Sequence, residues 1–205
     1  MTLQHALRLV PAAMVLTAAT MSATPVVQTA PLAMDTARVT IAGSSNVHHY
    51  GAWTDTVRVT SVKLAAPAAM DTFWDDVVKP GALEVFEVAI PAATLTSRDR
   101  GLDRNMYKAL KVETHRDIVF RLARLQRGVT GALLGVGTLR IAGVEREVAL
   151  TLETERRDGT LVVSGQLILL MTDYGITPPT AMLGILKTDP KVTVTFEAVL
   201  SVPRT

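Results

Sequence analysis

Residues 137–153 read Gly-Thr-Leu-Arg-Ile-Ala-Gly-Val-Glu-Arg-Glu-Val-Ala-Leu-Thr-Leu-Glu, and this stretch decides the fold. Apolar and polar residues alternate on both sides of Ala142-Gly143-Val144, which is a period of two and not the 3.6 of a helix. The stretch therefore predicts two antiparallel strands joined by a tight turn, each with one apolar and one polar face.

The same alternation extends outward in both directions, from about Arg38 to Ala198, and gives about eight strands. Asp158-Gly159 supplies a second hairpin turn between two of them. Long hairpin-linked strands with one apolar face must bury that face on themselves or on a second sheet. We therefore expect an all-β fold, a lipocalin-like antiparallel barrel of about eight strands. Glycines inside strands suit the bends of such a barrel, and they are Gly43, Gly135, Gly137 and Gly165.

One helix is expected within residues 99–111, where apolar residues recur at helical spacing and Asp103 can cap the first turn. A shorter helical turn is expected between Met70 and Val77. The loop from Asp173 to Lys187 is longer than most connections. We expect this loop and the helix to close one mouth of the barrel; ordinary packing of the loop on the barrel is the alternative.

The amino-acid composition excludes several kinds of site and partner. The 205 residues include no Cys, which excludes disulfides, thiolate nucleophiles and Cys-based metal sites. The formal net charge is only +2, and the basic residues Arg121, Arg124 and Arg127 lack interleaved aromatics, so we expect no nucleic-acid partner.

The N-terminus has the pattern of a signal peptide, because an uncharged apolar run from Leu9 to Ala19 is followed by small residues. We expect residues 1–23 to be this peptide, with cleavage as late as residue 33, and residues 24–36 to be a flexible lead-in. Residues 37–203 then form the barrel domain, in the periplasm or secreted. A membrane anchor or a disordered leader is the alternative for the N-terminus.

Six segments in order resemble the YceI-like family of bacterial lipid- or polyisoprenoid-binding proteins, over about residues 38–200. These segments are Gly43-Ser44-Ser45-Asn46-Val47; Ile90-Pro91 through Leu95-Thr96-Ser97; Asp103 with Met106 and Ala109-Leu110-Lys111; Ile118-Val119-Phe120; Gly137 through Val144 with Val148; and Met171 through Ile176 with Pro178-Pro179 and Leu183-Gly184.

The resemblance implies a lipocalin-like barrel, a periplasmic or secreted location and an elongated cavity for an isoprenoid or similar chain. The sequence departs from the family at three places. His48-His49 stands where the family often has His or Asp beside Trp, His115-Arg116-Asp117 replaces a proline, and Met70–Pro80 has no counterpart. These departures bear on the identity of the ligand more than on the fold.

Small inward residues such as Gly137, Gly165 and Ala198 leave space among large ones, so we expect a cavity inside the barrel. A solid core without ligand is the alternative. The candidate cavity or lid residues are Ile41, Val47, Phe86, Val88, Met106, Leu110, Ile118, Phe120, Leu139, Leu167, Met171, Ile176, Met182, Leu183 and Phe196.

Catalytic signals are weak. Adjacent His48 and His49 on a strand point to opposite faces, and with His115 they make a poor metal set, so we expect no metal and no cofactor. Ser44 and Ser45 lack the strand-turn-helix setting of a hydrolase nucleophile.

We therefore expect a binding or carrier protein that is not an enzyme, with an isoprenoid or other lipid in its barrel. A structural or protein-interaction module with a filled barrel is the second hypothesis, and a small hydrolase the third. The basic face with Arg98, Arg100, Arg104 and Lys108 is either a solvated helix surface or a site of transient membrane contact. The oligomeric state stays open, with a homodimer among the alternatives.

Overall fold

The computed structural model describes residues 32–65, 72–129, 131–181 and 186–203. One antiparallel sheet dominates, with the hydrogen-bonded order β2-β1-β10-β8-β7-β6-β5-β4-β3 and the short β9 on β10. The strands are β1 Ala33–Ser45, β2 His49–Thr54, β3 Arg58–Leu64, β4 Leu83–Pro91, β5 Asp117–Arg127, β6 Leu133–Ile141, β7 Val144–Arg157, β8 Thr160–Leu170, β9 Thr180–Ala181 and β10 Leu186–Ser201.

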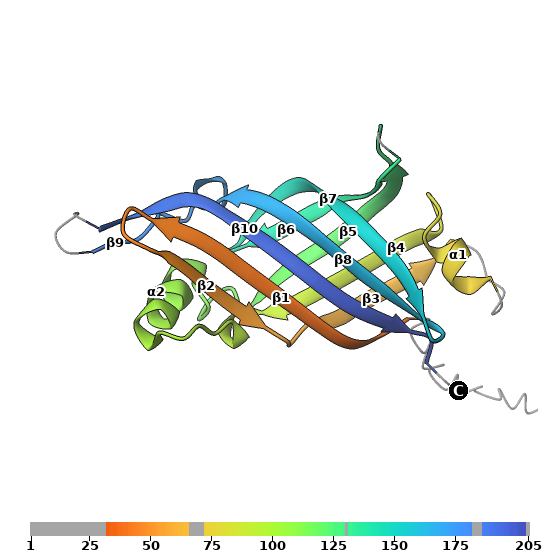
Figure 1. The fold of residues 1–205 in the computed structure, drawn as a ribbon, viewed down its shortest axis with the longest axis horizontal. Coiled ribbons are helices and arrows are strands. Elements are labelled where there is room, and N and C mark those ends of the chain that lie inside the picture. Colours follow the sequence, from red (N-terminus) through yellow and green to blue (C-terminus); the bar gives the residue numbers. More distant parts are fainter. Residues whose placement is uncertain (1–31, 66–71, 130, 182–185, 204–205) are drawn as a thin grey trace, which may run out of the picture.

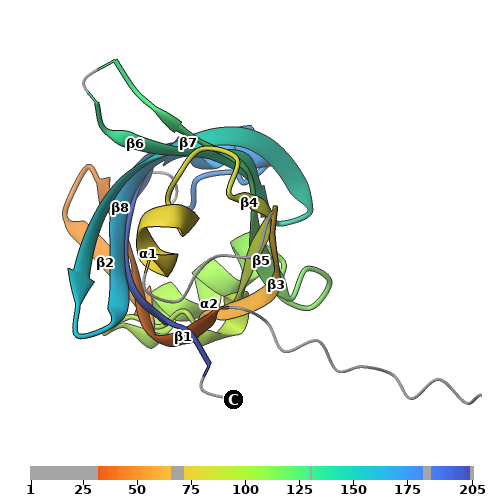
Figure 2. The ribbon, with the colours of Figure 1, turned by 90° about the vertical axis from the view of Figure 1, so that its right-hand side faces the viewer.

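The sheet curls round on itself into the expected all-β barrel, as the end-on view in Figure 2 shows. Its two edges are β2 and β3, which are consecutive in the chain. Near this seam the backbone N–H of Trp53 donates to Thr96 at 2.8 Å, and the N–H of Thr96 donates back at 2.9 Å. The segment that follows β4 is therefore hydrogen-bonded to β2 at the edge of the sheet.

Both predicted tight turns are confirmed. Ala142 (φ 50°) and Gly143 (φ 85°) link the paired residues at the ends of β6 and β7, and Asp158 (φ 49°) and Gly159 (φ 78°) link β7 to β8. Positive φ at both central residues is the type I′ geometry, whose twist matches that of the flanking strands.

The helix α2 spans Arg100–Leu110, within the range that the sequence predicted, but the prediction that Asp103 caps it was wrong. Asp99 caps the helix, accepting from the N–H of Gly101 at 2.6 Å and more weakly from Leu102. Asp103 lies in the first turn, and its carboxylate accepts from the N–H of Ser97 at 2.8 Å. A cap must stand before the first helical residue, because it serves N–H groups that lack an intrahelical partner.

Helical elements cover both ends of the barrel. The short helix α1, Phe73–Val77, lies at one end, and α2 lies at the other, together with the 3-10 turn η2, Met171–Tyr174 (Figure 1). A further 3-10 turn, η1, spans Ala92–Thr94 after β4.

Apolar side chains gather in a separate cluster at each end. We call the cluster under α2 and η2 the closed-end core; its buried members are Ala92, Leu95, Leu110, Ile118, Ile141, Ala142, Tyr174 and Ile176. We call the cluster under α1 the α1-end cluster; its buried members are Leu32, Phe73, Trp74, Val77, Leu161 and Leu200.

The structure differs from the sequence prediction in two further details. The first strand begins at Ala33, so the last four residues of the predicted lead-in belong to β1. The sheet also has more strands than the eight expected, because the chain between Arg38 and Thr60 forms three strands and β9 is added late. Across the described part of the chain, no helix is long and apolar enough to cross a membrane.

Candidate functional site

A cavity of about 210 Å³ lies inside the half of the barrel that faces α1. Side chains from β1, β4, β5, β6, β7, β8 and β10 line it, together with Val77 of α1 and Val57 before β3. Most of them come from alternate positions along a strand, because successive side chains point to opposite faces of a sheet. On β10, for example, Val194, Phe196, Ala198 and Leu200 all line the cavity. Bulges shift this alternation by one residue between Met34 and Ala37 on β1 and between Leu122 and Leu125 on β5.

The cavity ends where the closed-end core begins. Ile90 and Leu139 line the cavity on one side and pack against the closed-end core on the other. On three other strands, the residue one inward position beyond a lining residue belongs to the closed-end core or packs against it and does not line the cavity: Ile41 after Val39 on β1, Ile118 before Phe120 on β5 and Leu169 after Leu167 on β8. The inward side chains therefore form a floor across the barrel at the level of Ile90 and Leu139.

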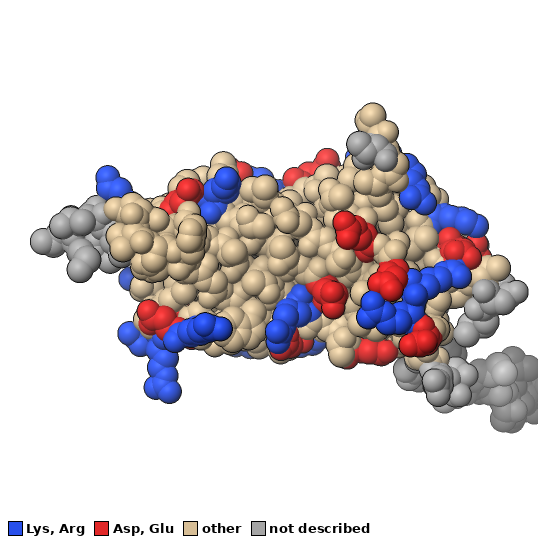
Figure 3. All heavy atoms as spheres, in the orientation of Figure 1, with Lys and Arg blue, Asp and Glu red and all other residues tan. Residues whose placement is uncertain are grey.

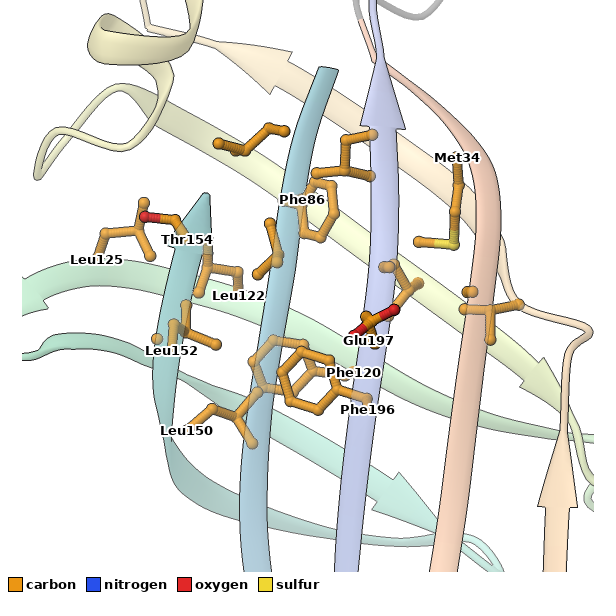
Figure 4. A pocket seen from close by; sticks show the side chains of 18 of the residues that line it. Met34, Phe86, Phe120, Leu122, Leu125, Leu150, Leu152, Thr154, Phe196 and Glu197 are labelled. Atoms are coloured by element: carbon orange, nitrogen blue, oxygen red, sulfur yellow. The ribbon is translucent and has the colours of Figure 1, made fainter. Parts of the chain in front are cut away.

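Two glycines make room for the two phenylalanines deepest in the cavity. Phe196 pairs across the sheet with Gly165, and a Cβ on Gly165 would stand 2.6 Å from Cζ of the ring. A Cβ on Gly137 would stand 2.9 Å from Cε2 and Cζ of Phe120. Both rings thus lie against the barrel wall in space that a side chain would otherwise fill, which leaves the centre open. Figure 4 shows both rings at the end of the cavity away from α1.

The mouth of the cavity lies under α1, which Figure 2 shows across that end of the barrel. Trp74 packs edge-on against Phe73, with ring centroids 5.1 Å apart, and its Nε1 donates to the carbonyl of Gly159 at 2.8 Å. An ion pair between Asp75 and Arg156 adds a second link to the β7–β8 hairpin. These contacts hold the helix on the rim, where Val77 faces the cavity.

The predicted site residues fall into four groups. Six line the cavity: Phe86, Val88, Phe120, Leu139, Leu167 and Phe196. Six others belong to the closed-end core or pack against it: Ile41, Met106, Leu110, Ile118, Met171 and Ile176. Val47 is 68% exposed. Met182 and Leu183 lie outside the described residues.

The placement of Val47 corrects the predicted alternation. The strand β1 ends at Ser45, whose hydroxyl accepts from the N–H of Val47 at 3.3 Å and from that of His48 at 3.1 Å. Such side-chain bonds to the following backbone make a turn. Val47 therefore stands on a hairpin turn and not on an inward strand position.

The lid hypothesis also needs revision. The helix α2 and the start of the long loop do cover one end of the barrel, but their apolar side chains pack into the closed-end core and do not line the cavity. The cavity reaches the other end, where Val77 and Val78 line it; these two belong to Met70–Pro80, the stretch without a counterpart in the family. Of this stretch, the structure describes residues 72–80.

Several lining residues were missed although they share the predicted alternation. Leu122, Leu152, Leu161, Val163 and Val194 face the cavity, and each stands two positions from another inward apolar residue. Counting every inward position of the alternating runs would have found them. Val77 is different, since no period in the strands points to it.

Among the described residues that line the cavity, the only polar side chains are those of Thr154 and Glu197, and both residues are exposed. Of the described residues that line the cavity, only Glu197 carries a charge, and it is exposed while its neighbours Phe196 and Ala198 are half-buried. Side chains with a shifted pKa lie outside the cavity. Hydrogen bonds from Thr60 and Arg121 lower the pKa of the Glu87 carboxyl on the outer surface, and burial raises the pKa of Tyr174 in the closed-end core.

The outside of the barrel is charged without being strongly basic. On the face shown in Figure 3, Lys and Arg side chains lie beside Asp and Glu. Arg38 with Asp55 at 2.7 Å and Lys79 with Asp76 at 2.7 Å are examples of such exposed ion pairs. No three His, Asp or Glu side chains gather as a metal site within the described ranges.

Comparison with protein families agrees with this architecture. The model of the YceI-like domain matches residues 31–200. The chain belongs to the YceI-like family. The predicted resemblance is therefore confirmed, and the family match includes every described strand of the barrel apart from Ser201, the last residue of β10.

Solved structures show the same YceI-like fold at low sequence identity. A polyisoprenoid-binding domain from Saccharophagus degradans is 14% identical with a TM-score of 0.62, covering 85% of this chain and 100% of that one. BcnA of Burkholderia cenocepacia is 15% identical with a TM-score of 0.60, covering 80% and 95%. The YceI protein of Campylobacter jejuni is 13% identical with a TM-score of 0.51, covering 73% and 85%. No curated protein matches the sequence.

Proposed function

We propose that this YceI-like protein is a non-catalytic carrier that holds the apolar chain of an isoprenoid or related lipid inside its barrel. The observation that carries the proposal is the apolar cavity of about 210 Å³. A single water needs only about 10–15 Å³ of such space and two or more polar partners, and an apolar wall lacks those partners. An apolar chain regains the packing contacts that an empty cavity forgoes.

Two further observations support a carrier over the other hypotheses. The half of the barrel towards α1 is not filled by side chains, which argues against a purely structural module. Among the described lining residues the exposed Glu197 is the only titratable one, which argues against a hydrolase. Similarity to a domain named as polyisoprenoid-binding supports the isoprenoid class of ligand.

The direct experiment is native mass spectrometry of the protein purified from its own host, followed by extraction into organic solvent. We expect a co-purifying isoprenoid or single-chain lipid at one molecule per chain. A protein that emerges empty and also binds no added isoprenoid, such as farnesol, would contradict the proposal.

The Gly135→Val variant is expected to bind farnesol at least tenfold more weakly while remaining folded. Gly135 lines the cavity, and a Cβ there would meet only the flexible Leu152 and Leu122 side chains, at 3.1 Å and 3.3 Å. The added methyl groups displace about three ligand carbons, worth ~2 kcal/mol at ~0.8 kcal/mol each. Isothermal titration measures the affinity and circular dichroism the fold.

A matched control is Gly51→Val on β2. This strand glycine is exposed, and a Cβ on it would meet only the carbonyl of Ile41, at 3.4 Å. The control should bind farnesol like the natural protein. Equal affinity in both valine variants would mean that the ligand does not occupy this cavity.

We also propose that the protein is exported, to the periplasm or beyond. The support is the leader-like pattern of residues 1–23. N-terminal sequencing of the mature protein from its bacterial host should place the first residue between 20 and 34. A mature chain that retains Met1 would contradict export through a cleaved leader.

A further inference from the structure

We infer that the cavity is closed at one end and therefore limits the length of the chain that it binds. It takes a single apolar tail to a depth of about a dozen carbons, and the polar head stays at the α1 end. This inference rests on the proposed function and names the ligand more closely. The ligand class is a single-chain amphiphile whose tail enters first.

The first step is that the cavity has a floor and no second exit at the far end. Beyond Ile90 and Leu139 the interior is the closed-end core, in which Leu95 is fully buried and Tyr174 is 2% exposed. Large side chains packed this densely leave no bore for a hydrocarbon chain. A tail that reaches the floor must stop there.

The second step is the depth. On β10 the lining runs from Leu200, which packs with α1 in the α1-end cluster, to Val194 at the floor. The six residue-to-residue steps between them span roughly 20 Å along the strand at ~3.3 Å each. A strand tilt of about 40° reduces that to ~15 Å along the barrel axis. Carbon–carbon bonds of ~1.5 Å advance an extended chain by roughly 1.3 Å each, so about 12 carbons fit.

The third step is the orientation of the ligand. A polar headgroup deep in the cavity would lose its hydration without finding partners, because every described lining side chain other than the exposed Thr154 and Glu197 is apolar. At the α1 end, by contrast, Asp75 pairs with Arg156 and Asp76 with Lys79 on the exposed rim. Polar groups and water are both within reach there, so the head stays at the mouth and the tail points to the floor.

The test is a series of alkyl maltosides from octyl to hexadecyl, each titrated below its micelle concentration. The sugar head is too large and polar for the cavity and keeps the orientation constant. Each carbon that enters should raise the affinity about fourfold. We expect this rise to stop near 12 carbons, since further carbons stay outside. A fourfold rise that continues through hexadecyl would overturn the length limit and leave the proposed function standing.

Two matched leucine variants locate the limit. Leu139→Ala trims the floor, whereas Leu161→Ala trims the wall near α1. The break in the series, which is the chain length at which the affinity stops rising, should become two or three carbons longer in Leu139→Ala, because a Leu side chain is three carbons larger than that of Ala. It should stay at the same length in Leu161→Ala. An unmoved break in folded Leu139→Ala would overturn the assignment of the floor.

Other results separate the two proposals. Failure of every alkyl maltoside and of farnesol to bind the natural protein would overturn the proposed function itself. Should Leu139→Ala not fold, Ile90→Val removes one carbon from the same floor, and a break that moves by about one carbon supports the inference. An unmoved break in Ile90→Val overturns it.

Discussion

The Gly165→Ala variant should lose about 3 kcal/mol or more of its free energy of unfolding, a large effect for one added methyl group. A Cβ at this position would stand 2.6 Å from the carbonyl oxygen of Thr151 and 2.6 Å from Cζ of Phe196. The carbonyl belongs to the neighbouring strand β7, so relief requires the two strands to separate. Urea unfolding followed by circular dichroism measures the loss.

The matched control is Gly135→Ala on β6, the strand on the other side of β7. Its Cβ would meet leucine methyl groups at 3.1 Å and 3.3 Å, which can rotate away. Replacing Gly with Ala also reduces the entropy of the unfolded chain, a gain of about 0.4–1 kcal/mol. We expect Gly135→Ala to match or slightly exceed the natural protein in stability. Equal losses in both variants would mean that the close approach at Gly165 is not what requires glycine there.

The same two glycine positions connect stability to the cavity. Phe120 and Phe196 are large enough to fill the bore, and they lie against the wall because residues 137 and 165 lack side chains. From the sequence, both glycines were predicted to be small inward residues that leave space. The structure adds that the space is occupied by phenylalanine rings from neighbouring strands, so the glycines open the centre of the barrel indirectly.

Period-two alternation predicted which side chains face inward, and it did so well on long strands. Phe120, Leu139, Leu167 and Phe196 all line the cavity. Alternation does not report depth along the bore. Ile118 has the same parity as Phe120 on β5, yet it packs in the closed-end core. What separates the two is the docking of α2 and η2 on one end, a tertiary contact that no local pattern encodes.

The position of α1 at the end of the barrel could not be predicted from the sequence either. Phe73, Trp74 and Val77 show helical spacing, and a short helical turn was predicted there. Its position was not, because the contacts that fix it come from Gly159 and Arg156, more than 80 residues away in the chain. A stretch without a counterpart in the family could equally have been a solvent-exposed insertion.

Trp74→Ala should lower the free energy of unfolding by about 3 kcal/mol and release bound dodecyl maltoside at least tenfold faster. Trp74 is 9% exposed, and its indole contributes both packing in the α1-end cluster and the bond to Gly159. Without it, α1 undocks from the rim more often. Since a ligand with its head at this end must leave past α1, more frequent undocking shortens its residence. Stopped-flow displacement gives the rate and urea unfolding the stability.

Two controls make the result specific to the mouth. Leu95→Ala removes a fully buried side chain from the closed-end core and should cost about 2–5 kcal/mol, yet leave the dissociation rate unchanged because that end has no exit. Trp74→Phe keeps an aromatic ring but loses the hydrogen bond to the Gly159 carbonyl, so it should cost only about 1 kcal/mol and speed release slightly. If Leu95→Ala released the ligand as fast as Trp74→Ala, general destabilisation would explain both results. The docking of α1 would then not control the rate at which the ligand dissociates.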